Sequence, residues 1–166
     1  MPIPPATADG SARRQAERGS FAPLASAEHV LLSMLTRHGA PVSAPVRVVV
    51  DGDLAYVRAR KPSRIWKHLR QATWVQVAPC GVLGLCRYGP WLDAAPRLLD
   101  GEEASEAARK LARRHPARPG RLGSLARRLR GGRPVYYELH ACGAAGRPGA
   151  ADPGKSRSRP ARLLPM

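Results

Sequence analysis

The stretch that decides the fold is Val42–Cys80, with the sequence VSAPVRVVVDGDLAYVRARKPSRIWKHLRQATWVQVAPC. Alternating β-branched residues predict a strand over Val42–Val50. Asp51-Gly52 is a strong hairpin signal, because glycine tolerates the positive φ of a primed turn. The partner strand that returns from this turn is predicted over Leu54–Ala59. Trp74–Ala78 alternates in the same way and predicts a third strand, ended by Pro79.

A short amphipathic helix is predicted between the second and third of these strands. Ser63 follows Pro62 and can cap the helix by accepting a backbone N–H. One side of the helix is apolar and the other is cationic through Arg64, Lys67 and neighbouring residues. A helix N-terminus and several arginines therefore meet at the end of a hairpin, which predicts an anion or phosphate cradle.

Outward from this stretch, further elements follow on both sides. Strands are predicted over His29–Thr36, Leu92–Leu99 and Pro134–His140, and a strand fragment over Leu85–Tyr88. A short helix is predicted over Phe21–Glu28, and a second amphipathic helix over Leu122–Leu129. Another helix is predicted to begin at Gly101, with acidic residues first and basic residues last. Pro96 interrupts one strand and suits an edge or a bulge.

The domain organisation follows from composition. Residues 1–20 and 142–166 have little apolar content, so we expect a disordered leader and a disordered basic tail around one domain at 21–141. No signal peptide or membrane span is visible, which indicates a soluble, cytoplasmic protein. The three cysteines do not make a disulfide framework or a zinc site.

The net charge is +16, from 28 basic and 12 acidic side chains. One interpretation is biased arginine usage together with solvated tails, and the other is an anionic partner, either nucleic acid or a polyanionic cofactor. The histidines share no helical spacing, and we predict neither a catalytic side chain nor a metal site from the sequence.

The ordered series of motifs resembles the F420 (deazaflavin)-dependent branch of the pyridoxamine 5′-phosphate oxidase-like proteins. It comprises Phe21–Leu24, the APV, DGD and YVR segments, the S-x-x-x-K helix, VAPC, Gly89–Trp91, Arg97–Ala104 and Arg133–Leu139. The resemblance implies a mainly β fold with helices, a split β-barrel of the FMN-binding type, and a homodimer. It also implies that the cofactor carries the hydride to a small organic acceptor while the protein binds and orients it.

The resemblance also implies a cofactor site. Arg58, Ser63, Arg64 and Lys67 would hold the phosphate, and the backbone of Ser43, Ala44, Pro45 and Val46 would line the ring. Trp91 either lies beside the ring or, like Trp74, is an aromatic of the core or dimer interface.

Three positions depart from the family pattern: Ala44, Ala59 and Ile65. Each removes a hydrogen-bond donor or a charge from the implied phosphate pocket, and the guanidinium of Arg60 or Arg64 can replace it. Two other interpretations therefore stay open: an FMN-binding enzyme on the same scaffold, and a non-catalytic basic protein that binds nucleic acid. Because charge alone supports the last of these, we expect no nucleic-acid partner.

Overall fold

The computed structural model of the protein describes residues 19–116 and 132–143. Its elements are the 3₁₀ helix η1 (Ala22–Leu24), the strands β1 (His29–Leu35), β2 (Pro41–Asp51), β3 (Leu54–Arg60), β4 (Val75–Cys80), β5 (Leu92–Leu99) and β6 (Pro134–Ala141), and the helices α2 (Arg64–Leu69) and α3 (Gly101–Arg114). The predicted leader at 1–18, the helix Leu122–Leu129 and the tail from residue 144 lie outside the described residues.

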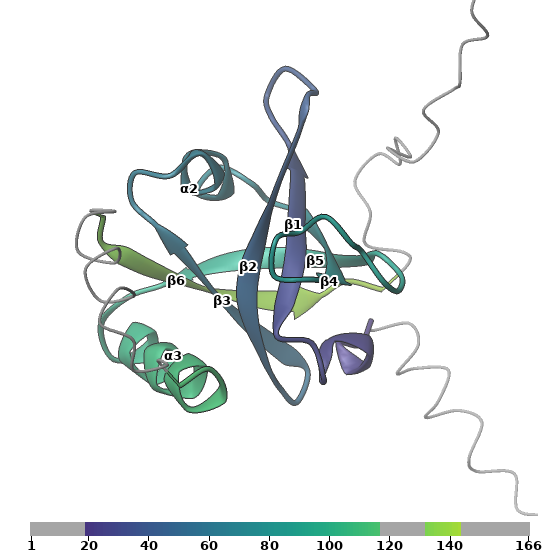
Figure 1. Cartoon of the computed structure of the whole chain (residues 1–166). Coiled ribbons are helices and arrows are strands. Elements are labelled where there is room, and N and C mark those ends of the chain that lie inside the picture. Colours follow the sequence, from purple (N-terminus) through teal and green to yellow (C-terminus); the bar gives the residue numbers. More distant parts are fainter. Residues whose placement is uncertain (1–18, 117–131, 144–166) are drawn as a thin grey trace, which may run out of the picture.

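The six strands close into an antiparallel barrel in the order β1-β2-β3-β6-β5-β4 (Figure 1). This arrangement confirms the predicted split-barrel fold, mainly β with few helices. Alternation within each strand directs one set of side chains inward, because successive residues of a strand point to opposite faces. In β3, for example, Ala55, Val57 and Ala59 are buried in the barrel core.

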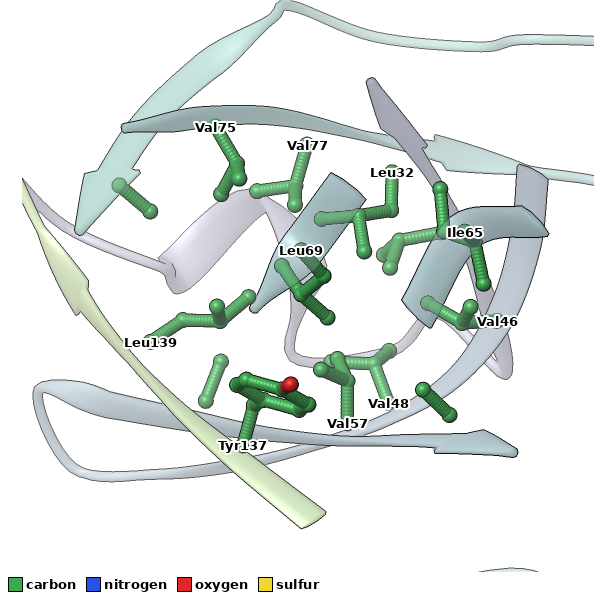
Figure 2. Close-up of a cluster of buried hydrophobic side chains, with 14 of the residues drawn as sticks. Leu32, Val46, Val48, Val57, Ile65, Leu69, Val75, Val77, Tyr137 and Leu139 are labelled. Atoms are coloured by element: carbon green, nitrogen blue, oxygen red, sulfur yellow. The ribbon is translucent and has the colours of Figure 1, made fainter. Parts of the chain in front are cut away.

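Helix α2 covers one end of the barrel, and its apolar side completes the core. Figure 2 shows Ile65 and Leu69 of α2 among the strand side chains, with Leu69 near the centre of the cluster. Leu69 is 1% exposed. The helix begins as predicted, because the Ser63 hydroxyl accepts a hydrogen bond from the Trp66 backbone N–H at 3.2 Å.

Helix α3 packs on the outside of the barrel beside β3 and β6 (Figure 1). Its buried residues Ala107 and Leu111 form a second apolar cluster with Tyr56 and Leu99. Glu102 and Glu103 lie in its first turn and Arg113 and Arg114 in its last, as the charge order along the sequence predicts. Among the described helices, none is both long enough and apolar enough to cross a membrane.

Three predicted elements differ in the structure. The short helix predicted over Phe21–Glu28 is only the three-residue η1. Pro79 does not end β4, because it pairs with Val30 of β1 and the strand continues to Cys80. The fragment Leu85–Tyr88 is reduced to a single bridge between Cys80 and Arg87.

Candidate functional site

A cleft opens where β2 and β3 separate. The ladder between the two strands runs from the Asp51–Leu54 pair to the Val48–Val57 pair and then stops. Beyond that point β2 pairs with β1, and β3 pairs with β6. The facing edges of β2 and β3 therefore diverge, and α2 lies beneath the opening.

This space, which we call the barrel cleft, has a volume of about 430 Å³. It is lined by His29, Ala44, Pro45, Val46, Arg47, Arg58, Ala59, Arg60, Ser63, Ile65 and Val82. Its size lies within the range of about 300–1,000 Å³ that is typical of small-molecule sites. Small apolar side chains form one wall of the cleft, and arginine side chains form the other.

The cationic wall consists of Arg47, Arg58 and Arg60. Arg58 and Arg60 are two residues apart on β3, so both point away from the core, and Arg47 projects outward between Val46 and Val48. Among residues 19–116 and 132–143, none that lines the barrel cleft is a carboxylate. The cleft therefore has a positive potential that favours an anionic group.

Several carboxylates on or near α3 form ion pairs on another part of the barrel surface. Glu103 and the buried Glu138 both accept hydrogen bonds from Arg97, at 2.9 and 3.1 Å, and Glu138 also contacts the His140 ring. Burial by itself raises the pKa of Glu138, but the hydrogen bonds from Arg97 and His140 outweigh it and hold the pKa below its ordinary value.

A second carboxylate contact on that surface belongs to Lys110. Its ammonium lies 2.7 Å from Asp51 and 3.1 Å from Glu106, and the hydrogen bond to Asp51 raises the pKa of Lys110. No ion pair of this kind reaches Arg47, Arg58 or Arg60 within the part of the chain that the structure describes.

Of the nine residues that the sequence predicts for the site, five line the barrel cleft together: Ala44, Pro45, Val46, Arg58 and Ser63. Three others point elsewhere. Ser43 donates a hydrogen bond to the Ser33 hydroxyl across the β1–β2 ladder at 2.9 Å. Arg64 and Lys67 are exposed on α2 and do not line the cleft, because the inward side of the helix belongs to Ile65 and Leu69.

Neither predicted tryptophan lines the barrel cleft. Trp91 is half-buried, and the Arg87 guanidinium lies 5.2 Å from its ring centroid. Two cations that flank α2 are engaged elsewhere, since Lys61 and Arg70 lie 5.2 and 5.3 Å from the centroid of the Trp66 ring. The arginine cluster predicted around Ser63 is thus divided: Arg60 joins Arg58 in the cleft, whereas Arg70 packs on Trp66.

Sequence reasoning missed three lining residues, Arg47, His29 and Val82. Arg47 could have been found from the sequence, because a residue between two inward-facing valines of a strand must point outward. His29 lies beside His115 of α3 with the ring centroids 6.4 Å apart. Burial, then the charges of Arg47 and His115, lower the pKa of His29, which favours its neutral form.

Val82 reaches the barrel cleft from the loop that follows β4. A turn closes this loop through the Gly84 N–H, which donates to the Gly81 carbonyl at 2.9 Å. Gly84 has a φ of +70°, and a Cβ there would lie 3.2 Å from Pro45 of β2. Glycine therefore permits both the turn and its close approach to the cleft wall.

Comparison with known proteins shows the fold. No protein-family model matches the sequence, and a search of curated proteins found no match. A candidate 5-nitroimidazole antibiotic resistance protein from Bacteroides thetaiotaomicron has a TM-score of 0.53 at 13% identity, over 72% of this chain and 76% of that one. The heme storage protein HutZ from Vibrio cholerae has a TM-score of 0.52 at 12% identity, over 70% and 82%.

A candidate pyridoxamine 5′-phosphate oxidase from Listeria innocua has a TM-score of 0.48 at 13% identity, over 73% of this chain and 89% of that one. At these levels of identity the comparison shows the fold alone. The chain shares its split-barrel fold with the first two of these proteins.

Proposed function

We propose that the protein is an F420-dependent oxidoreductase, which binds the deazaflavin in the barrel cleft and passes a hydride to a small organic acceptor. The observation that carries the proposal is the cleft itself. A space of about 430 Å³ lies between diverging strands. Three arginines line it, and none of the described residues that line it is a carboxylate. A phosphate-bearing cofactor with a flat apolar ring matches both walls.

On this proposal, Arg58 and Arg60 hold the phosphate, because a guanidinium donates two parallel hydrogen bonds to phosphate oxygens. The Ser63 hydroxyl already accepts from the Trp66 N–H. It still has its own hydrogen to donate to a phosphate oxygen. Arg47 adds positive charge from β2.

The ring would lie against the small side chains of Ala44, Pro45 and Val46, with the buried Ile65 as an apolar floor. When bound, the cofactor supplies the hydride chemistry. The side chains around it orient the ring and exclude water, with Val82 covering one edge. This division of labour is consistent with a cleft whose lining has no carboxylate to act as a general base.

Two fluorescence titrations of the full chain, one with F420 and one with FMN, test the proposal. We expect saturable F420 binding that is tighter than FMN binding. Tighter FMN binding would instead assign the same cleft to a flavin enzyme. If neither compound binds at micromolar concentration, the cofactor function is refuted.

We also propose that the protein is a homodimer. Val82, Leu83, Leu85 and Tyr88 are between 55% and 83% exposed in the loop after β4. A second copy of the chain could bury this contiguous apolar segment, which a monomer leaves in water. Analytical ultracentrifugation should give a dimer at micromolar concentration, and a stable monomer would contradict the proposal.

A further inference from the structure

We propose that a second cleft, between the last turns of α3 and the barrel wall, binds a small carboxylate with a flat apolar body. This α3 cleft has a volume of about 310 Å³ and is lined by Arg47, Arg58, Ala108, Leu111, Ala112, His115 and Tyr136. It is distinct from the barrel cleft, although the two share Arg47 and Arg58.

The helix provides an apolar wall. Ala108, Leu111 and Ala112 follow the i, i+3, i+4 spacing, so they lie on one face of α3. Leu111 is 7% exposed and packs into the apolar cluster beneath. The two alanines leave the space that larger side chains would fill. Tyr136 of β6 adds an aromatic side chain to this lining.

The opposite rim is cationic. Arg58 is directly paired with Tyr136 in the β3–β6 ladder, so the guanidinium and the phenol project from the same outer face. Arg47 directly precedes Val48, the first residue of β2 to pair with β3, and lies across the opening from Arg58. Like charges at facing positions repel each other, and a bound carboxylate would remove that repulsion.

His115 fixes the width of the α3 cleft. Its Nε2 lies 2.8 Å from the Val48 carbonyl oxygen, so this nitrogen carries the hydrogen and donates it. The contact ties the C-terminal end of α3 to the point where β2 and β3 separate. The hydrogen bond from the His115 ring therefore sets the distance between the apolar wall and the arginine rim.

The α3 cleft has room for a small ligand. Its volume of about 310 Å³ lies near the lower end of the range of about 300–1,000 Å³ that is typical of small-molecule sites. A benzoate-sized acid fits this space, with its carboxylate toward Arg47 and Arg58 and its ring between Tyr136 and the alanines. Inorganic phosphate could pair with the two arginines of the rim, but it would leave the apolar wall in contact with water.

Two probes of nearly equal shape test the site: benzoate and the neutral benzamide, titrated into the ¹⁵N-labelled full chain and followed by NMR. We expect benzoate to shift the amides of Ala108, Ala112 and Tyr136, with benzamide at least tenfold weaker. Equal affinities for the two compounds, or shifts confined to other residues, would overturn the proposal.

Variants give the second arm of the test. Ala112→Leu places a larger side chain in the cleft and should weaken benzoate binding at least tenfold. Ser105→Leu, an exposed position on the same helix that lines neither cleft, should leave it unchanged. Arg47→Gln should weaken benzoate about tenfold but not benzamide. Equal effects of the two leucine variants, or no effect of Arg47→Gln, would refute the site.

The outcome is separable from that of the proposed function. Ala112 does not line the barrel cleft, so Ala112→Leu should leave the F420 and FMN titrations unchanged. Selective benzoate binding in a chain that binds neither cofactor would support the α3 cleft and reject only the oxidoreductase. Cofactor binding without benzoate discrimination would do the reverse.

Discussion

Replacement of Arg58 by glutamine should change cofactor affinity and protein stability in opposite directions. Hydrogen bonds to charged groups contribute about 1.5–3 kcal/mol. Loss of the guanidinium should therefore weaken F420 binding roughly 10- to 150-fold, at a factor of ten per ~1.4 kcal/mol. Stability of the free protein should rise by about 0.2–1 kcal/mol, because Arg47 loses its like-charged neighbour. This corresponds to a melting temperature roughly 1–5 °C higher.

F420 fluorescence titration measures the affinity, and thermal unfolding without cofactor measures the stability. Arg109→Gln is the matched control, since Arg109 is exposed on α3 and lines neither cleft, yet its replacement removes the same charge. A lower melting temperature for Arg58→Gln would show that Arg58 is a structural residue. An equal loss of affinity in both variants would show that only the net charge of the chain matters.

The strands could be predicted because their signals are local. The alternating valines before Asp51-Gly52 fix which residues of β2 face the core, and the same alternation places Arg58 and Arg60 on the outer face of β3. Pro79 misled the prediction, because a proline lacks only the N–H. It can occupy a strand position where the ladder does not need that donor, as it does opposite Val30.

The site itself was only partly predictable. Distant segments build it: His29 comes from the start of β1, Arg58 from β3, and Val82 from the loop after β4. No pattern in one sequence reports such pairs. The family resemblance implied a phosphate-binding role for Lys67, but Lys67 is exposed because Ile65 and Leu69 occupy the buried side of α2. The packing of the six-residue helix α2 on the barrel thus decides which of its cations reach the cleft.

Three further predictions concern stability. Leu69→Ala should cost about 2–5 kcal/mol in urea unfolding, because it opens a cavity at the end of the barrel that α2 covers; a loss below about 1 kcal/mol would show that α2 is dispensable. Gly132→Ala should lower the melting temperature far more than Gly39→Ala: both glycines have positive φ, but only at Gly132 would a Cβ lie 2.2 Å from the Lys61 carbonyl oxygen. Equal effects would refute the steric argument. Glu138→Gln should reduce the loss of unfolding free energy that occurs as the pH falls below neutral. Because the folded state lowers the pKa of Glu138, its ionised form stabilises the protein above the unfolded pKa of about 4.3, and that contribution is lost as the pH falls through the lower folded value. The stability difference between the parent and Glu138→Gln should therefore be largest near pH 7 and shrink toward pH 3 in urea unfolding series. A difference that stays constant over that range would mean that the carboxylate charge of Glu138, hydrogen-bonded to Arg97 and in contact with His140, does not contribute to the barrel's stability.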